Sequence, residues 1–120
     1  MRFFDTYAII ETINGNLSYE KYKEEVFITN TLHLSEFVYS LLRNLSEELT
    51  EKILKTLNFQ FIEISEEIAV EAAKFKYKHK TKNFSYADCI GYITALKNDL
   101  LFLTGDKEFR NLKNVEFISK

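Results

Sequence analysis

The 120-residue sequence contains no proline, no tryptophan, three glycines and one cysteine. Because proline and glycine mark turns and breaks, their scarcity predicts dense regular structure with short loops. The single cysteine, Cys89, excludes an internal disulfide bond and is compatible with a reducing cytoplasm. Cys89 lies in a strongly apolar segment, so we predict that it belongs to the core and is not a reactive thiol.

Long apolar runs and an excess of positive charge are also absent. No stretch approaches the ~18 apolar residues of a membrane span, and the first residues lack the pattern of a signal peptide, so we expect neither. The formal net charge of −2 argues against a general polyanion binder, although a local basic patch or a bound cation can still attract nucleic acid. At this length we expect residues 1–120 to form one domain.

The chain instead shows short apolar runs that alternate with segments of helical periodicity. The apolar runs predict strands at residues 2–5, 26–29, 59–64, 100–103 and 115–118. Helical spacing predicts helices at residues 6–14, 19–24, 31–45, from 46 onward, 65–80 and 85–98. Hydroxyl residues suited to capping begin most of them, namely Ser18, Thr31, Ser46, Ser65 and Ser85. This order predicts a three-layer α/β/α fold around a mostly parallel five-stranded sheet.

Aspartate is rare, because only four of the eighteen acidic residues are aspartates: Asp5, Asp88, Asp99 and Asp106. Asp5 and Asp106 each follow a buried strand, and we expect these two strands to lie side by side so that the acids meet. In open parallel sheets the carboxyl edge is where ligands bind. Asp88 lies in the first turn of a helix that is apolar almost all round. Asp99, at the other end of its strand, should be dispensable.

Each acid also has a purely structural interpretation. Asp5 and Asp106 are suited to capping the helices that follow them, and Asp88 completes a capping box with Ser85. Glu36 lies opposite the apolar stripe of its helix, where a solvated glutamate is common. We favour a functional site because the other helices begin with serine or threonine, and because no cap explains Glu36.

A cluster of these acids has a chemical consequence. Two carboxylates about 4 Å apart repel by roughly 4 kcal/mol at an effective dielectric constant of 20. Several together are destabilising unless some are protonated or a cation lies among them. An all-oxygen site suits Mg²⁺ or Mn²⁺ better than zinc. Such an ion can activate water and neutralise a phosphate, which points to phosphoryl or phosphodiester transfer.

The segments Phe4-Asp5-Thr6, Ser35-Glu36-Phe37, Ser85-Tyr86-Ala87-Asp88 and Leu103-Thr104-Gly105-Asp106-Lys107-Glu108-Phe109 resemble the four motifs of PIN-domain nucleases. The size and element order are similar to those of VapC toxins from toxin–antitoxin pairs. Tyr7 departs from the pattern, since smaller residues are frequent there.

The resemblance implies a Mg²⁺- or Mn²⁺-dependent endoribonuclease that cleaves RNA with metal-activated water. Its catalytic acids would be Asp5, Glu36, Asp88 and Asp106, and the metal ligands Asp5, Asp88 and Asp106. The hydroxyls of Thr6 and Thr104 would support the site on its substrate side. It further implies an antitoxin partner and a homodimer. The alternative function is a non-catalytic PIN-like module that binds RNA or a partner protein.

The densest positive charge is at residues 74–82, which read Lys-Phe-Lys-Tyr-Lys-His-Lys-Thr-Lys. Its structural interpretation is a solvated helix end whose lysines complement the helix dipole. In the functional interpretation Lys80 and Lys82 guide an RNA backbone toward Asp88.

Other active-site patterns fail on their residues. A dehalogenase-type phosphatase needs a second aspartate where Tyr7 stands, and there is no glycine-rich phosphate loop. Serine hydrolase chemistry needs a histidine, and the sequence holds only His33 and His79. We assign His33 a surface or packing role, although it lies one turn before Glu36 and could touch a ligand. We expect His79 to face solvent.

Overall fold

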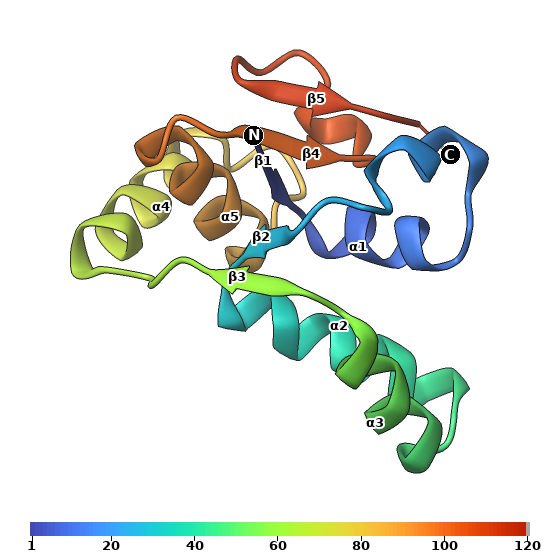
Figure 1. Cartoon of the computed structure of the whole chain (residues 1–120). Coiled ribbons are helices and arrows are strands. Elements are labelled where there is room, and N and C mark those ends of the chain that lie inside the picture. The colour runs from blue at the N-terminus through green and yellow to red at the C-terminus, as the bar shows by residue number, and fades with distance from the viewer. Residues whose placement is uncertain (120) are drawn as a thin grey trace.

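The computed structural model describes residues 1–119, and a sheet of five parallel strands lies at its centre (Figure 1). The strands are β1 (Arg2–Phe4), β2 (Phe27–Thr29), β3 (Phe59–Phe61), β4 (Leu101–Thr104) and β5 (Val115–Phe117). Their spatial order is β3-β2-β1-β4-β5, so β1 and β4 pair directly, as predicted. The strand order reverses between β1 and β4, and their carboxyl ends form the switch point of the sheet.

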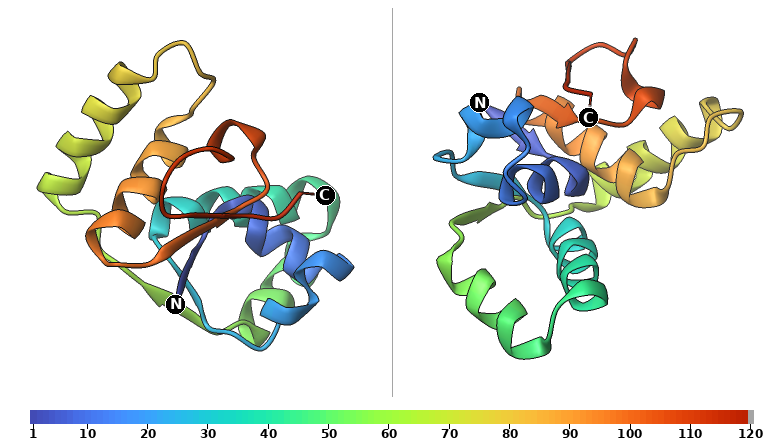
Figure 2. Two further views of the ribbon diagram at one scale, coloured as in Figure 1. Left: turned by 90° about the horizontal axis from the view of Figure 1, so that it is seen from above. Right: turned by 90° about the vertical axis from the view of Figure 1, so that its right-hand side faces the viewer.

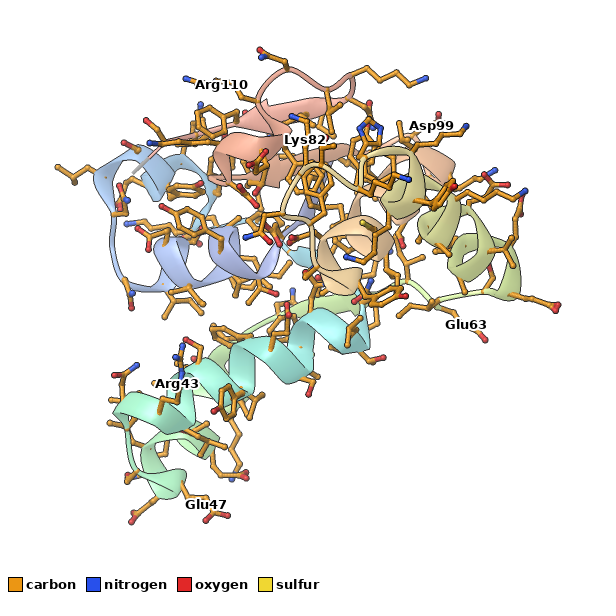
Figure 3. The ribbon with its side chains drawn as sticks, turned by 180° about the vertical axis from the view of Figure 1, so that it is seen from behind. Arg43, Glu47, Glu63, Lys82, Asp99 and Arg110 are labelled. Atoms are coloured by element: carbon orange, nitrogen blue, oxygen red, sulfur yellow. The ribbon has the colours of Figure 1, made fainter. Side chains whose placement is uncertain are left out.

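The helices lie on both faces of this sheet, which confirms the predicted α/β architecture. They are α1 (Thr6–Ile13), the 3₁₀ helix η1 (Leu17–Tyr22), α2 (Thr31–Asn44), α3 (Glu47–Thr56), α4 (Glu66–Lys78), α5 (Tyr86–Lys97) and the 3₁₀ helix η2 (Lys107–Phe109). Helices α2 and α3 extend away from the sheet as an arm (Figures 1 and 2), and Arg43 and Glu47 mark its far end (Figure 3). Among the described residues, every helix falls short of the length and apolar character that a membrane span requires.

Successive side chains of β1 and β4 point to opposite faces of the sheet, so a separate core forms on each face. Phe3 and Phe102 belong to the cluster under α4 and α5, whereas Phe4 and Leu103 belong to the cluster under α1, η1 and α2. All four side chains are fully buried. Cys89 is also fully buried, which confirms its predicted place in the core, and burial raises the pKa of its thiol to about 11.

The predicted helix caps Ser18 and Thr31 are wrong, because an asparagine occupies the N-cap position of each of these helices. The side chain of Asn16 accepts from the backbone N–H of Ser18 at 2.9 Å, and that of Asn30 accepts from the N–H of His33 at 2.9 Å. Asparagine reaches a backbone N–H two or three residues further on, so Ser18 and Thr31 already lie inside their helices. The other three caps are confirmed, namely Ser46, Ser65 and Ser85.

Some predicted elements are also too long. Strand β3 ends at Phe61 because its neighbour β2 turns into α2 after Thr29, and Thr29 receives the final ladder bond from Ile62 at 2.8 Å. Helix α4 ends at Lys78 and not at Lys80. Strand β4 is buried only from its second residue onward, since Leu101 is 39% exposed.

A charged network fastens the edge strand β5 to the rest of the sheet. Arg2 lies between Glu25 and Glu116, at 3.0 Å and 2.5 Å, and the Tyr22 hydroxyl donates to Glu116 at 2.5 Å. Partial burial opposes ionisation of Glu116, but the Tyr22 and Arg2 bonds outweigh it and lower the pKa of this carboxyl. The network therefore stabilises the fold only while Glu116 is ionised.

Replacing Glu116 with glutamine should lower the free energy of unfolding by about 1–2 kcal/mol at neutral pH, because a bond to a charged group contributes about 1.5–3 kcal/mol and partial exposure reduces this. The folded pKa lies below the ordinary value of 4.5, so the contribution is present above pH 4.5 and is lost as the pH falls through the folded pKa. Urea unfolding of both proteins across this range measures the difference. Glu51→Gln, on the exposed face of α3, is the matched control, and an equal loss there would contradict the assignment.

Candidate active site

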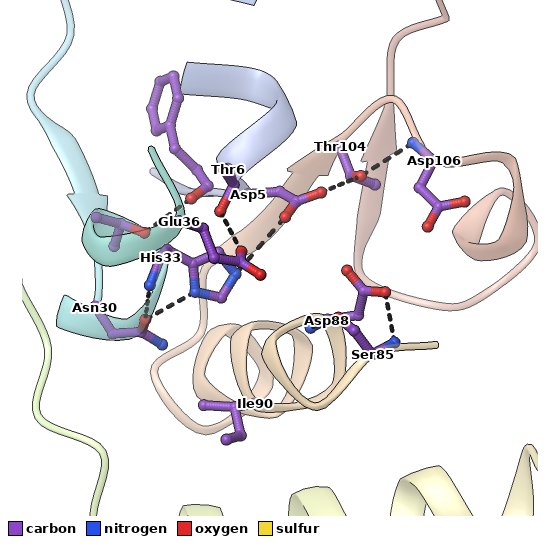
Figure 4. A network of polar contacts seen from close by, with 12 residues as sticks. Asp5, Thr6, Asn30, His33, Glu36, Ser85, Asp88, Ile90, Thr104 and Asp106 are labelled. Atoms are coloured by element: carbon purple, nitrogen blue, oxygen red, sulfur yellow. Dashed lines mark hydrogen bonds and ion pairs between the residues drawn. The ribbon is translucent and has the colours of Figure 1, made fainter. Parts of the chain in front are cut away.

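Asp5 follows β1 at the switch point of the sheet and is only 5% exposed. Its backbone occupies the N-cap position of α1, yet its side chain makes no capping hydrogen bond. One carboxylate oxygen, Oδ2, accepts from the Thr104 hydroxyl at 2.7 Å, and the other, Oδ1, lies 3.6 Å from His33 Nε2 (Figure 4). The side chain thus points toward neighbouring elements and not at its own helix.

Asp106 is tied to the same hydroxyl. Its backbone N–H donates to Thr104 Oγ1 at 3.1 Å, so one buried threonine connects the ends of β1 and β4. The Asp106 side chain accepts from the Glu108 N–H at 3.0 Å and caps η2. The capping interpretation is therefore correct for one oxygen of Asp106.

Asp88 approaches from the first turn of α5. The predicted capping box is present, because Ser85 N–H donates to Asp88 Oδ2 at 2.8 Å and Asp88 N–H donates to the Ser85 hydroxyl at 3.0 Å. Burial, followed by the negative charges of Asp5 and Asp106, raises the pKa of Asp88 to about 6 despite the opposing Ser85 bonds. The charges of Asp5 and Asp106 therefore act on the carboxyl group of Asp88.

Glu36 reaches this site from the exposed side of α2. Its Oε1 accepts from the Thr6 hydroxyl at 2.7 Å, which brings the carboxylate to the start of α1, beside Asp5 (Figure 4). Both candidate threonine hydroxyls are thus bonded to candidate acids. Thr104 is fully buried, so its hydroxyl orients Asp5 from within the protein and does not face solvent.

His33 is not at the surface and lies closer to the acids than a packing role requires. Its ring is fully buried, and a Cβ at Gly91 would lie 2.7 Å from it. The spacing along the helix could have predicted this position. His33 lies four residues before the buried Phe37 and three before Glu36, so the three side chains share one side of α2. His33 therefore belongs to the site.

A second glycine makes room for Tyr7, the residue that departs from the family pattern. A Cβ at Gly105 would lie 2.1 Å from the Tyr7 ring. The aromatic ring of α1 thus rests directly on the turn that carries Asp106. Gly105 is required here by this close approach.

The two lysines occupy the connection between α4 and α5. Lys82 forms an ion pair with Glu108 at 3.7 Å, beside the turn that carries Asp106. Lys80 is exposed, and its ammonium lies 4.7 Å from the centre of the Tyr77 ring. Lys82 is therefore the one that the structure brings toward the acids.

The residues fit a divalent cation. The candidate donors are carboxylate oxygens, which suit hard ions such as Mg²⁺ and Mn²⁺. Burial raises the pKa of Asp88 most, and the negative charges of Asp5 and Asp106 add to this effect. A cation among the acids would relieve that repulsion. Within residues 1–119 no three side chains of His, Cys, Asp or Glu converge closely enough to form a ready-made ligand set. Water would have to supply part of any metal coordination.

A cleft of about 650 Å³ lies at the opposite, amino edge of the sheet, and its lining includes Thr12, Phe27 and Leu57. The acids are at the carboxyl edge, so the cleft is separate from them.

Comparison with known proteins identifies the family. The PIN domain profile matches residues 2–115, almost the whole chain. The chain belongs to the PIN domain family. No curated protein matches it by sequence.

Solved structures share the fold of this PIN domain. A toxin–antitoxin complex from Klebsiella pneumoniae has a TM-score of 0.75 at 22% identity, with 97% of this chain and 96% of that chain covered. VapC20 of Mycobacterium tuberculosis, a toxin that cleaves the sarcin-ricin loop, has a TM-score of 0.76 at 14% identity, with 100% and 98% covered. VapBC2 from Rickettsia felis, bound to a promoter DNA fragment, has a TM-score of 0.74 at 15% identity, with 98% and 97% covered. These likenesses extend over nearly the whole of each chain.

The raised pKa of Asp88 predicts an unusual stability profile for the metal-free PIN domain. Between about pH 4 and about pH 6 the folded protein holds a proton that the unfolded chain has released, so the free energy of unfolding decreases as the pH rises through this range. Asp88→Asn retains the capping acceptor without the charge. We expect it to be more stable than the wild type by about 1–3 kcal/mol above pH 6 and to lack this decrease.

Thermal or urea unfolding in EDTA measures the effect. Asp99→Asn is the matched control, because Asp99 is exposed and its φ of 54° is one that asparagine also adopts. A wild-type profile parallel to that of Asp88→Asn would contradict the assigned coupling.

Proposed function

We propose that this PIN domain is a metal-dependent endoribonuclease and the toxin of a type II toxin–antitoxin pair. The observation that carries the proposal is the Asp5 side chain: a buried carboxylate at a helix start that does not cap its helix and instead contacts Thr104 and His33 at the switch point. A structural acid at this position would bond to the first-turn N–H groups of α1. A role in binding a metal ion at the switch point explains why the Asp5 side chain turns away from its own helix.

The four acids have distinct roles in this proposal. Asp5, Asp88 and Asp106 hold a Mg²⁺ or Mn²⁺ ion, and Thr104 fixes Asp5 by its 2.7 Å hydrogen bond. Glu36, kept in place by Thr6, binds the ion or orients the attacking water. A divalent cation bound here would activate water and neutralise the phosphate during cleavage of an RNA phosphodiester.

The lysines between α4 and α5 supply the attraction for RNA that the net charge lacks. Lys80 and Lys82 guide the phosphate backbone toward Asp88, which lies in the first turn of the next helix. The ion pair with Glu108 keeps Lys82 next to the Asp106 turn. Thr6 lies on the same exposed side as Glu36 and contributes to the substrate surface.

We extend the proposal to the context of the protein. The solved structures above include complexes of toxin with antitoxin, which supports an antitoxin partner for this chain and is compatible with a homodimer. Residues 1–120 act as one domain, since the family profile spans nearly all of them. A single buried cysteine is compatible with a cytoplasmic location.

Substituting Asp5 or Asp88 with asparagine should abolish RNA cleavage. We expect a loss of about 10²–10⁴-fold, the range for removing a group that acts directly in the reaction. The assay is Mg²⁺- or Mn²⁺-dependent cleavage of a fluorogenic RNA oligonucleotide and of total bacterial RNA. Asp99→Asn is the control and should retain full activity. Full activity in either site variant would exclude the assigned roles.

A metal titration separates this function from that of a non-catalytic PIN-like module. A cation that relieves repulsion among the acids binds the folded state, so millimolar Mn²⁺ should raise the melting temperature of the wild type by more than it raises that of Asp88→Asn. An unchanged melting temperature together with RNA binding would favour the non-catalytic module.

Neutralising both lysines should weaken RNA binding and flatten its dependence on salt. Removing one lysine–phosphate interaction reduces the slope of log affinity against log salt by about 0.7 for a single strand. The test is fluorescence anisotropy of Lys80→Gln/Lys82→Gln with a single-stranded RNA, in Ca²⁺ to suppress cleavage. Lys52→Gln/Lys55→Gln, on the exposed side of α3, is the control pair. A salt slope equal to that of the wild type would remove the proposed role.

A further inference from the structure

His33 has a polar atom that its surroundings leave without a partner. Its side chain is fully buried in the first turn of α2. Its Nε2 has no hydrogen-bond partner among the described residues. Oδ1 of Asp5 lies 3.6 Å from it, which is beyond hydrogen-bonding distance (Figure 4).

The hydrogen bonds of Asn30 determine which ring nitrogen carries the proton. Asn30 Oδ1 accepts from the backbone N–H of His33 at 2.9 Å and lies 2.7 Å from His33 Nδ1. A carbonyl oxygen only accepts, and turning the amide over would destroy the cap of α2. Nδ1 must therefore be the donor. In a neutral imidazole Nε2 then presents a bare lone pair.

With a neutral imidazole, two electron-pair donors face each other inside the protein. The Nε2 lone pair and the Asp5 carboxylate repel unless something positive lies between them. Two ligand atoms that are each about 2.1 Å from one ion lie between about 3.0 Å and about 4.2 Å apart, depending on the angle at the ion. The observed separation of 3.6 Å falls within this range.

Helix α5 is shaped to admit the imidazole. A Cβ at Gly91 would lie 2.7 Å from both Cε1 and Nε2 of His33. Gly91 comes three residues after Asp88, so the two share one face of α5. Glycine inside a helix costs about 1 kcal/mol relative to alanine. That cost is offset by the close approach of Nε2 to the face that carries Asp88.

We propose that His33 Nε2 is a ligand of the divalent cation that the acids hold, and that Asp5 and His33 together form its central pair of ligands. This proposal rests on the proposed function, because it assumes a cation at the acidic site. Magnesium and manganese both accept carboxylate oxygens, but imidazole nitrogen favours transition metals. The mixed nitrogen and oxygen ligands therefore make the site selective for Mn²⁺ over Mg²⁺.

Pulsed electron paramagnetic resonance of the Mn²⁺-loaded protein tests the proposal without any substitution. A directly bound imidazole gives electron spin echo modulation from its ¹⁴N nucleus. We expect this modulation in the wild type and in His79→Gln, and its loss in His33→Gln. The sequence holds only these two histidines, so His79 is the matched control.

Affinity provides the second readout. His33→Gln should weaken Mn²⁺ binding by about 10–100-fold, the range for altering the close environment of a bound metal. Mg²⁺ binding, measured by competition, should change less. Gly91→Ala keeps the imidazole but displaces it, and should reduce the Mn²⁺ preference even if the buried His33→Gln variant does not fold.

The outcomes separate this proposal from the nuclease assignment. Bound Mn²⁺ that supports RNA cleavage but shows no nitrogen modulation would overturn the role of His33 and leave the nuclease assignment intact. A protonated His33 that forms an ion pair with Asp5 would give this result, because its Nε2 could not bind the metal. If Mn²⁺ does not bind at all, both proposals fail.

Discussion

The hydrogen bond from the Thr104 hydroxyl to Asp5 is the contact on which the arrangement of the acids depends. It joins the ends of β1 and β4 at the switch point, and the same hydroxyl oxygen accepts from the backbone of Asp106. Without it, repulsion from Asp88 and Asp106 would favour rotation of Asp5 toward the first turn of α1, whose free N–H groups donate to a capping carboxylate. One buried hydroxyl therefore fixes the positions of two acids, because the strand order places β1 beside β4.

Positions along the chain could be predicted from the sequence, because strand ends and helix starts follow local rules. The capping box of Ser85 and Asp88 and the pairing of β1 with β4 are of this kind. The direction in which each side chain points could not be predicted. Asp5 and Asp106 both occupy extended N-cap positions, yet Asp106 caps its helix and Asp5 does not. The difference arises from contacts between residues distant in sequence.

The placement of His33 shows the same limit more strongly. Its helical spacing was visible, but its burial depends on the missing side chain of Gly91, on a helix that comes much later in the chain. Its protonated nitrogen depends on Asn30, whereas the sequence suggested Thr31 as the cap. Capping preference distinguishes asparagine from threonine only weakly. Because the cap of α2 was placed one residue too late, the hydrogen bond between Asn30 and His33, and with it the state of His33 Nε2, could not be predicted.

The strand order also has a consequence for biosynthesis. Asp5 and Thr104 are 99 positions apart, and β1 lies in the middle of the sheet although it is made first. A ribosome releases the amino-terminal acid long before the strand that orients it, and long-range pairings of this kind form late. Chains released by interrupted translation would carry Asp5 and Glu36 but not the assembled site. Incomplete fragments therefore lack the arrangement of acids that the full chain has.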